Sequence, residues 1–159
     1  MINNYSQIGY KCSRNYMKAG ENMKFTKIKV SAQIKKPLDR VWRYYTDPEH
    51  VMQWNHASDD WHCPHAENDL REGGRFCYTM ASKDGKAKFD FEGVYTKVEP
   101  FSHIAYALED GREVTVDFTN LGHVTEVVVD FDAEGENTLE LQRNGWQEIL
   151  NHFKNHVEG

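Results

Sequence analysis

The chain has 159 residues, which is enough for one domain with a full hydrophobic core and too few to suggest two. Its 19 Lys and Arg against 25 Asp and Glu give a net charge of −6, and no basic run could neutralise a phosphate backbone, so nucleic acid is excluded as an expected partner. Its three scattered cysteines are typical of a reducing cytoplasm, and the lack of an apolar run of roughly 20 residues excludes a membrane helix.

The N-terminal stretch, residues 1–22, has no hydrophobic period and lacks the apolar centre of a secretory signal. We therefore expect a poorly ordered tail over residues 1–22 and a single domain over residues 23–158. One hypothesis is that Met23 is the natural start of the protein. Trimming the chain to Met23 would then leave stability and ligand binding unchanged.

One strand and two short helices are expected next. Residues 26–34 alternate apolar and polar side chains, which is typical of a half-buried strand. Pro37 suits the first position of a short amphipathic helix. The apolar stripe of this helix consists of Leu38, Val41, Trp42 and Tyr45. Asp47 and Pro48 repeat the start signal, an N-cap acid followed by proline, for a second helix that reaches about Gln53.

Residues 54–74 follow neither the helical nor the strand period, and they combine two tryptophans and three histidines with a cysteine and several acids. A long aperiodic connection of this composition is hard to explain by core packing alone. The sequence therefore predicts a loop at residues 54–74 that marks a functional site.

Five alternating segments after Gly74 predict a meander of strands. They are centred on Tyr78, Phe91, Tyr106, Val116 and Val129. Gly85 and Gly111 each follow an aspartate between two segments, and such Asp-Gly pairs supply the positive φ angles of tight hairpins. Neighbouring strands are therefore expected to be antiparallel. Asn137 and Thr138 begin a long terminal helix by a capping-box-like signal, and Gly145 interrupts that helix before Trp146. The fold class is α+β, with helices gathered on one side of an antiparallel sheet.

Several short motifs in this order resemble the START-like, helix-grip superfamily (SRPBCC), and within it the bacterial stand-alone relatives of the C-terminal domain of the activator of heat-shock protein 90 ATPase. The resemblance runs from Met23 to about Val157. Its carriers are Val41-Trp42, Asp47-Pro48, Trp54, Gly73-Gly74-Arg75-Phe76, Phe91-Glu92-Gly93-Val94-Tyr95, Ile104-Ala105-Tyr106, Thr125 and Gly145-Trp146. The residues 57–64 also look like a block from one subgroup of these proteins. The resemblance implies a curved antiparallel sheet of about six strands around a long C-terminal helix, with an apolar cavity between them.

Aromatic and apolar side chains that point inward on this register are the candidate ligand-binding residues. They are Trp54, Trp61, Phe76, Tyr78, Met80, Phe89, Phe91, Tyr95, Tyr106, Trp146 and Leu150. The alternative is that these side chains simply fill the core, although buried phenols need polar partners. Trp54 and Trp61 either close the cavity mouth as a lid or anchor the loop to the domain.

Metal and catalytic residues are weakly indicated. His62, Cys63 and His65, with His56 nearby, include the side chains that zinc prefers, but no second ligand pair follows, so no metal and no cofactor are expected. Asp60 and His62 are candidate proton-transfer residues. His152 and His156 are expected on the exposed face of the terminal helix.

Three classes of function remain open on the sequence. The first is the binding of a small hydrophobic or aromatic molecule between the sheet and the helix. The second is a cyclase- or hydrolase-type enzyme that acts in the same cavity. The third is a co-chaperone-like interaction module, although the separate N-terminal domain of the co-chaperone is missing here. Whether the protein is an enzyme stays undecided, with binding favoured, and a monomer or a homodimer in the cytoplasm is expected.

Overall fold

The structure is a computed structural model that describes residues 25–159. The predicted tail over residues 1–22 and the hypothesis that Met23 is the start therefore lie outside the described residues. The elements in chain order are β1 Lys27–Ile34, α1 Leu38–Thr46, α2 Pro48–Trp54, β2 Trp61–Asn68, β3 Arg75–Ser82, β4 Lys88–Glu99, β5 His103–Ala107, β6 Glu113–Asn120, β7 Thr125–Asp132 and α3 Leu139–Glu158.

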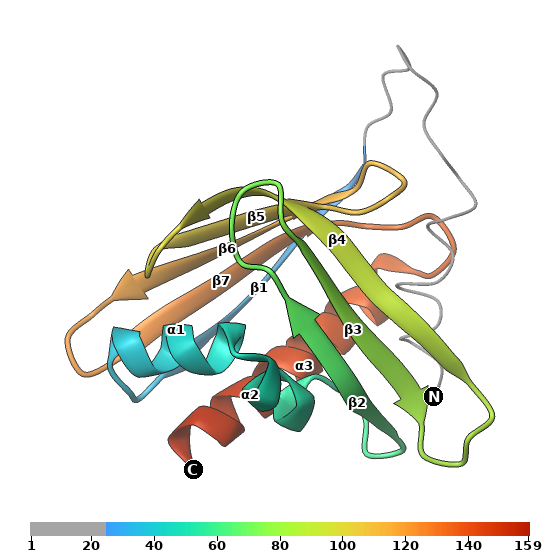
Figure 1. Cartoon of the computed structure of the whole chain (residues 1–159), viewed down its shortest axis with the longest axis horizontal. Helices are drawn as coiled ribbons and strands as arrows, with labels where there is room; N and C mark the ends of the chain where they lie inside the picture. Colours follow the sequence, from blue (N-terminus) through green and yellow to red (C-terminus); the bar gives the residue numbers. More distant parts are fainter. Residues whose placement is uncertain (1–24) are drawn as a thin grey trace.

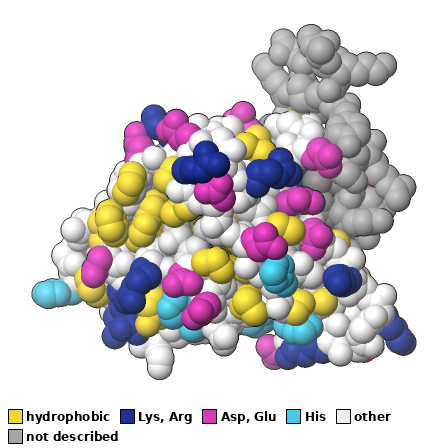
Figure 2. All heavy atoms as spheres, viewed as in Figure 1, with side chains coloured by type: hydrophobic (Ala, Val, Ile, Leu, Met, Phe, Trp, Pro, Cys, Tyr) yellow, Lys and Arg dark blue, Asp and Glu magenta, His cyan; other side chains and the backbone are white. Residues whose placement is uncertain are grey.

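All seven strands form one antiparallel sheet in the order β1-β7-β6-β5-β4-β3-β2. The sheet is curled into a half-barrel, and α3 runs across its concave face (Figure 1). The two short helices lie together near the C-terminal end of α3 (Figure 1). This arrangement confirms the predicted α+β helix-grip fold, because one apolar face of a sheet is covered by the apolar stripe of a helix. Figure 2 shows that acidic, basic and histidine side chains are interspersed over the face it presents.

The additional strand, β2, lies within the segment that was predicted to be an aperiodic loop, and that prediction is wrong for Trp61–Asn68. Trp61 and Cys63 are buried at alternate positions, as a strand requires. The pairing with β3 then shifts between His62 and His65, at a bulge that contains Pro64. Proline has no N–H to donate to a neighbouring strand, and an edge strand with a bulge is one of the few places in a sheet that accept it.

The turn glycines and helix-capping residues predicted from the sequence adopt the expected conformations and hydrogen bonds. Gly85 and Gly111 have φ angles of 79° and 95°, in the left-handed region that glycine adopts without steric cost. The Asp47 carboxylate accepts a hydrogen bond of 3.0 Å from the backbone N–H of Glu49 at the start of α2. The Thr138 hydroxyl accepts one of 3.1 Å from the N–H of Leu141 at the start of α3. Both predicted helix starts are therefore confirmed.

The core lies between α3 and the concave face of the sheet. Phe153 and Val157 of α3 are fully buried, as are Ile34 of β1 and Val127 of β7. Trp146 lies flat on Phe131 of β7, with ring centroids 4.1 Å apart and planes 11° apart. Within residues 25–159, the helices are too short or too polar to span a lipid bilayer.

Candidate functional site

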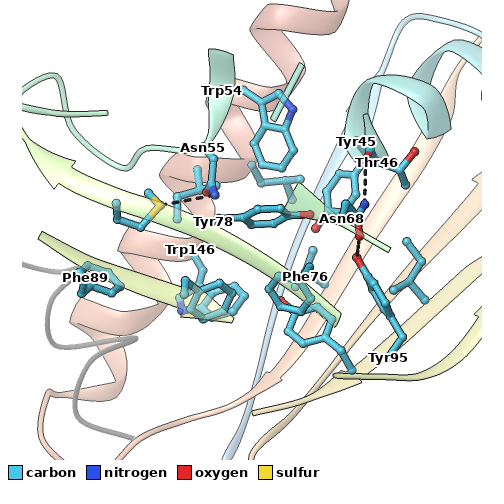
Figure 3. Close-up of a pocket in the computed structure, with 17 residues that line it drawn as sticks. Tyr45, Thr46, Trp54, Asn55, Asn68, Phe76, Tyr78, Phe89, Tyr95 and Trp146 are labelled. Atoms are coloured by element: carbon cyan, nitrogen blue, oxygen red, sulfur yellow. Dashed lines mark hydrogen bonds between the residues drawn. The ribbon is translucent and has the colours of Figure 1, made fainter. Parts of the chain in front are cut away.

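A cavity lies between α3, the two short helices and the strands β2 to β5 and β7 (Figure 3). Its volume, counted as the space open to the centre of a water molecule, is about 80 Å³, and it is partly open to solvent. Apolar and aromatic side chains form most of its wall. The lining residues are Tyr45, Thr46, Trp54, Asn55, Asn68, Phe76, Tyr78, Met80, Phe89, Phe91, Tyr95, Ile104, Tyr106, Val129, Trp146, Ile149 and Leu150.

The floor of the cavity is built by the register of β3 on β4. Tyr78 pairs with Phe91 and Met80 pairs with Phe89, so these side chains lie side by side on the concave face. The Trp146 ring meets the Phe91 ring edge-on from α3, with centroids 6.0 Å apart. Met80, Phe89, Phe91 and Trp146 form the apolar end of the cavity.

Gly93 of β4 makes room for another ring in this floor. It pairs with Phe76 of β3, and a Cβ atom at Gly93 would lie 3.0 Å from the Cε1 of that ring and 2.8 Å from the backbone oxygen of Ala107. Real Cβ atoms essentially never come within 2.8 Å of another atom, and a contact of 3.0 Å is tighter than nine in ten of theirs. The missing side chain therefore lets the Phe76 ring lie over the strand, where it contacts the Tyr106 ring edge-on at 4.7 Å.

Phenols and the Asn68 amide form the polar end of the cavity (Figure 3). The Tyr95 hydroxyl donates a hydrogen bond of 2.6 Å to the Asn68 Oδ1, and the Asn68 Nδ2 donates one of 2.8 Å to the backbone oxygen of Thr46. This chain of bonds links β4, β2 and α1. Tyr45 and Tyr78 lie beside it in the same wall.

Burial raises the pKa of these phenols further above physiological pH. Desolvation raises the pKa of Tyr95 to about 12, and it raises the pKa of Tyr78 and of Tyr106 well above the ordinary value. The pKa of Tyr45 is raised for the same reason. The polar end therefore offers neutral hydroxyl groups at physiological pH. Among the described residues that line the cavity, none is an acid, a histidine, a lysine or an arginine.

Every predicted ligand-binding residue except Trp61 lines the cavity. Trp61 on β2 is only 3% exposed and does not line the cavity. Its ring packs against the Phe89 ring, with centroids 6.0 Å apart. Trp54 is 4% exposed, and its indole N–H donates a hydrogen bond of 2.9 Å to the backbone oxygen of Tyr44. Both tryptophans are buried and packed into the domain, which favours the anchor alternative.

Sequence reasoning missed several lining residues. They are Tyr45, Thr46, Asn55, Asn68, Ile104, Val129 and Ile149. Tyr45 and Ile149 belong to predicted helical stripes, and Ile104 and Val129 belong to predicted strands. The periodicity of these elements could therefore have predicted that the four side chains point inward. Asn68 belongs to the unpredicted strand β2.

The two candidate proton-transfer residues do not face the cavity. Asp60 lies in an exposed turn, where its carboxylate accepts a hydrogen bond of 2.6 Å from Ser58 and its pKa is lowered chiefly by that bond. His62 is exposed on β2. Cys63 is buried, and desolvation raises the pKa of its thiol to about 11. His65 is exposed and lies 2.7 Å from Glu67. The local His-Cys-His sequence therefore does not converge on one point.

Histidines from two distant segments meet beside the cavity instead. His56, which follows α2, stacks on His152 of α3 with ring centroids 4.3 Å apart. Desolvation, His152 and Lys83 lower the pKa of His56 to about 4, against an opposing effect of Asp59. A second pair joins His50 of α2 to His156 of α3, with the Nδ1 of the first 3.0 Å from the Nε2 of the second. His152 and His156 are half-buried and partnered, which corrects the expectation that they lie on an exposed face.

The curled antiparallel sheet around a long C-terminal helix, with a cavity between them, defines a START-like protein of the helix-grip class. The family model for Activator of Hsp90 ATPase homolog 1-like protein matches residues 35–158. The chain belongs to this family.

Solved structures support the same assignment. The AHSA1-like protein from Aeromonas hydrophila is 44% identical over 84% of this chain and 92% of its own, with a TM-score of 0.79. Chr148 from Cytophaga hutchinsonii is 47% identical over 83% of this chain and 92% of its own, with a TM-score of 0.73. CV1439 from Chromobacterium violaceum shares the fold at 22% identity, over 84% of this chain and 99% of its own, with a TM-score of 0.74. No curated protein matches the chain.

Proposed function

We propose that this protein binds one compact, uncharged apolar or aromatic molecule in the cavity beneath α3. The observation that carries the proposal is a partly open cavity walled by aromatic side chains, with phenol hydroxyls and the Asn68 amide at one end. Ligand pockets combine an apolar lining with a few polar groups that fix orientation. The favoured ligand thus has an apolar body near Phe91 and Trp146 and one polar group near Tyr78 and Tyr95.

The wall of the cavity favours a neutral ligand. A charged group loses several kcal/mol of hydration on burial unless an opposite charge or strong hydrogen bonds compensate it. The described lining residues carry no ionised side chain, and the phenols keep their protons. Neutral hydroxyl, carbonyl or amide groups on the ligand match these phenols as hydrogen-bond partners.

The volume favours a small ligand. Pockets for drug-sized ligands measure roughly 300–1,000 Å³, and the cavity volume of about 80 Å³ lies well below that range. A molecule of about one ring has this size, whereas a lipid chain exceeds it. Ligands this small bind with a Kd on the order of 0.01–1 mM, so a screen must use millimolar concentrations.

The two alternative functions have less support from the site. A proton-transfer enzyme needs an acid or a base beside the bound molecule, whereas Asp60 and His62 lie outside the cavity. The chaperone-interaction alternative rests on the family name. A pull-down from the native cell extract tests it, with chaperone enrichment as the positive result.

A matched set of single-ring ligands tests the binding proposal. Benzyl alcohol, benzoate and benzylamine differ mainly in charge, and ligand-observed NMR at millimolar concentration ranks their binding. We expect benzyl alcohol to bind and the two charged compounds to bind at least about tenfold more weakly. No detectable binding of any neutral ring compound, or a preference for a charged one, would contradict the proposal.

Two variants on α3 test whether the ligand binds in the cavity. Ile149→Trp adds bulk to a lining position, while Leu141→Trp adds the same bulk to a position that is 40% exposed and does not line the cavity. The first should abolish benzyl alcohol binding and the second should preserve it.

The phenol contact is tested by Tyr78→Phe, which keeps the ring and removes the hydroxyl. It should weaken benzyl alcohol binding more than toluene binding, because only the alcohol can form a hydrogen bond with Tyr78. Equal effects on both ligands would show that the polar group lies elsewhere.

A further inference from the structure

A second site is assembled from residues that the cavity does not use. His56 and Asp59 lie in the segment between α2 and β2, and His152 lies on α3. Each offers one ligand atom, and these three atoms all lie within 4.8 Å of one another. Two imidazoles and a carboxylate form a donor set that suits transition metals such as Zn²⁺ better than Mg²⁺ or Ca²⁺, which prefer oxygen alone.

The hydrogen bonding of His152 prepares that ring to bind a metal. Its Nδ1 lies 2.6 Å from the backbone oxygen of His56. A carbonyl oxygen only accepts, so the Nδ1 carries the proton and the Nε2 keeps a free lone pair. Metal-binding histidines almost always donate their second ring N–H to a carbonyl or carboxylate in this way, because it fixes the tautomer and the ring orientation.

We propose that His56, Asp59 and His152 bind one divalent transition-metal ion of the zinc class. Three protein ligands leave a fourth position open to water or another small ligand, as in sites where zinc is not purely structural. This inference departs from the sequence expectation of no metal, which considered His62, Cys63 and His65 instead.

Binding requires a modest local change. Two ligands at about 2.0–2.1 Å from a tetrahedral metal are about 3.3 Å apart, so the three atoms move together by at most roughly 1.5 Å. The His56 ring also turns out of its stack on His152, since a metal lies in the plane of each imidazole that binds it. Asp59 is exposed in a turn between α2 and β2, where its side chain is free to rotate.

The position of the site connects it to the cavity. His56 directly follows Trp54 and Asn55, which both line the cavity. A metal bound by His56 and His152 ties the C-terminal end of α2 to α3 and so stabilises one wall of the cavity. The folded protein gains stability from such an ion because the unfolded chain does not assemble the three ligands.

The test uses the full chain with its cysteines kept reduced. Isothermal titration with Zn²⁺ alone gives the number of ions and the affinity, and the absorption spectrum with Co²⁺ gives the ligand types. The variants are His56→Gln, Asp59→Asn and His152→Gln. His123→Gln is the control, since this exposed histidine lies in the β6–β7 turn and outside the cluster.

We expect one Zn²⁺ per chain, a higher melting temperature with the ion, and a loss of affinity of roughly tenfold or more in each cluster variant but not in the control. Asp59→Asn alters only an exposed side chain, so it tests the site even if His152→Gln impairs folding. The proposal is overturned by the absence of saturable one-to-one binding or by an unchanged affinity of Asp59→Asn. A Co²⁺ spectrum with an intense thiolate charge-transfer band would overturn it too, because the proposed ligands include no sulfur.

Discussion

The substitution Gly93→Ala tests the packing of the cavity floor. The added methyl would lie 2.8 Å from the Ala107 backbone oxygen and 3.0 Å from the Phe76 ring, so the ring or the strand must move. Overpacking of this kind costs about 1–3 kcal/mol. Because Gly93 has no positive φ, alanine also gains about 0.4–1 kcal/mol from the lower entropy of the unfolded chain. The net loss in the free energy of unfolding is therefore between about 0 and 2.6 kcal/mol.

Urea denaturation of the two proteins measures this difference, and the midpoint of thermal unfolding should fall by up to about 10 °C. Gly135→Ala is the matched control, because a Cβ there meets no atom within 4 Å and the residue has no positive φ. This control should be neutral or slightly stabilising. The displaced Phe76 ring should also weaken benzyl alcohol binding. If Gly93→Ala proves as stable as the control, the close approach of Phe76 and Ala107 does not constrain the sheet.

Three further measurements test local features of the fold. Asp47→Ala removes the side chain that caps α2, so urea denaturation should show a loss of about 1 kcal/mol, and an unchanged midpoint would refute the cap. Tyr95→Phe leaves the Asn68 Oδ1 without its phenol donor and should lower the free energy of unfolding by about 1–3 kcal/mol, whereas a neutral result would mean that water replaces the phenol. Burial, followed by His50 and Arg40, lowers the pKa of His156 below its ordinary 6.5. The unfolded chain therefore binds a proton more readily than the folded protein, and stability decreases as the pH is lowered below about 6.5. In metal-free buffer His156→Gln should flatten this fall and His123→Gln should not, and equal slopes would contradict the assignment.

Most of the fold follows from side-chain periodicity, and the exception has a physical cause. Alternation identified β3 to β7 because their apolar side chains recur largely at a two-residue period, which the buried residues follow most regularly in β5, β6 and β7. In β2 the period breaks, since Trp61 and Cys63 are buried and the next buried residue is Ala66, three positions on. The bulge at Pro64 supplies that extra residue. A search for two short alternating stretches joined by a proline could have found the strand.

The cavity was predictable in composition, and the paired histidines were not. Phe76, Tyr78 and Met80 point inward because alternate residues of one strand share a face, a rule that needs no tertiary information. The contact of His56 with His152 spans 96 positions in the chain, and it depends on how α2 lies against α3. No spacing in the sequence indicates how α2 packs against α3. The sequence therefore drew attention to the neighbouring residues around Cys63 as possible metal ligands.

The bulge in β2 has a consequence beyond the single chain. As the last strand of a half-barrel, β2 has an outer edge that pairs with no strand in residues 25–159, and such an edge is a template for strands of other molecules. Pro64 has no N–H to donate to an added strand, and the register of β2 shifts around it at a bulge, a feature that increases the local twist of a strand. These features disfavour strand addition at the β2 edge, so replacing the proline is expected to raise the tendency of the protein to aggregate.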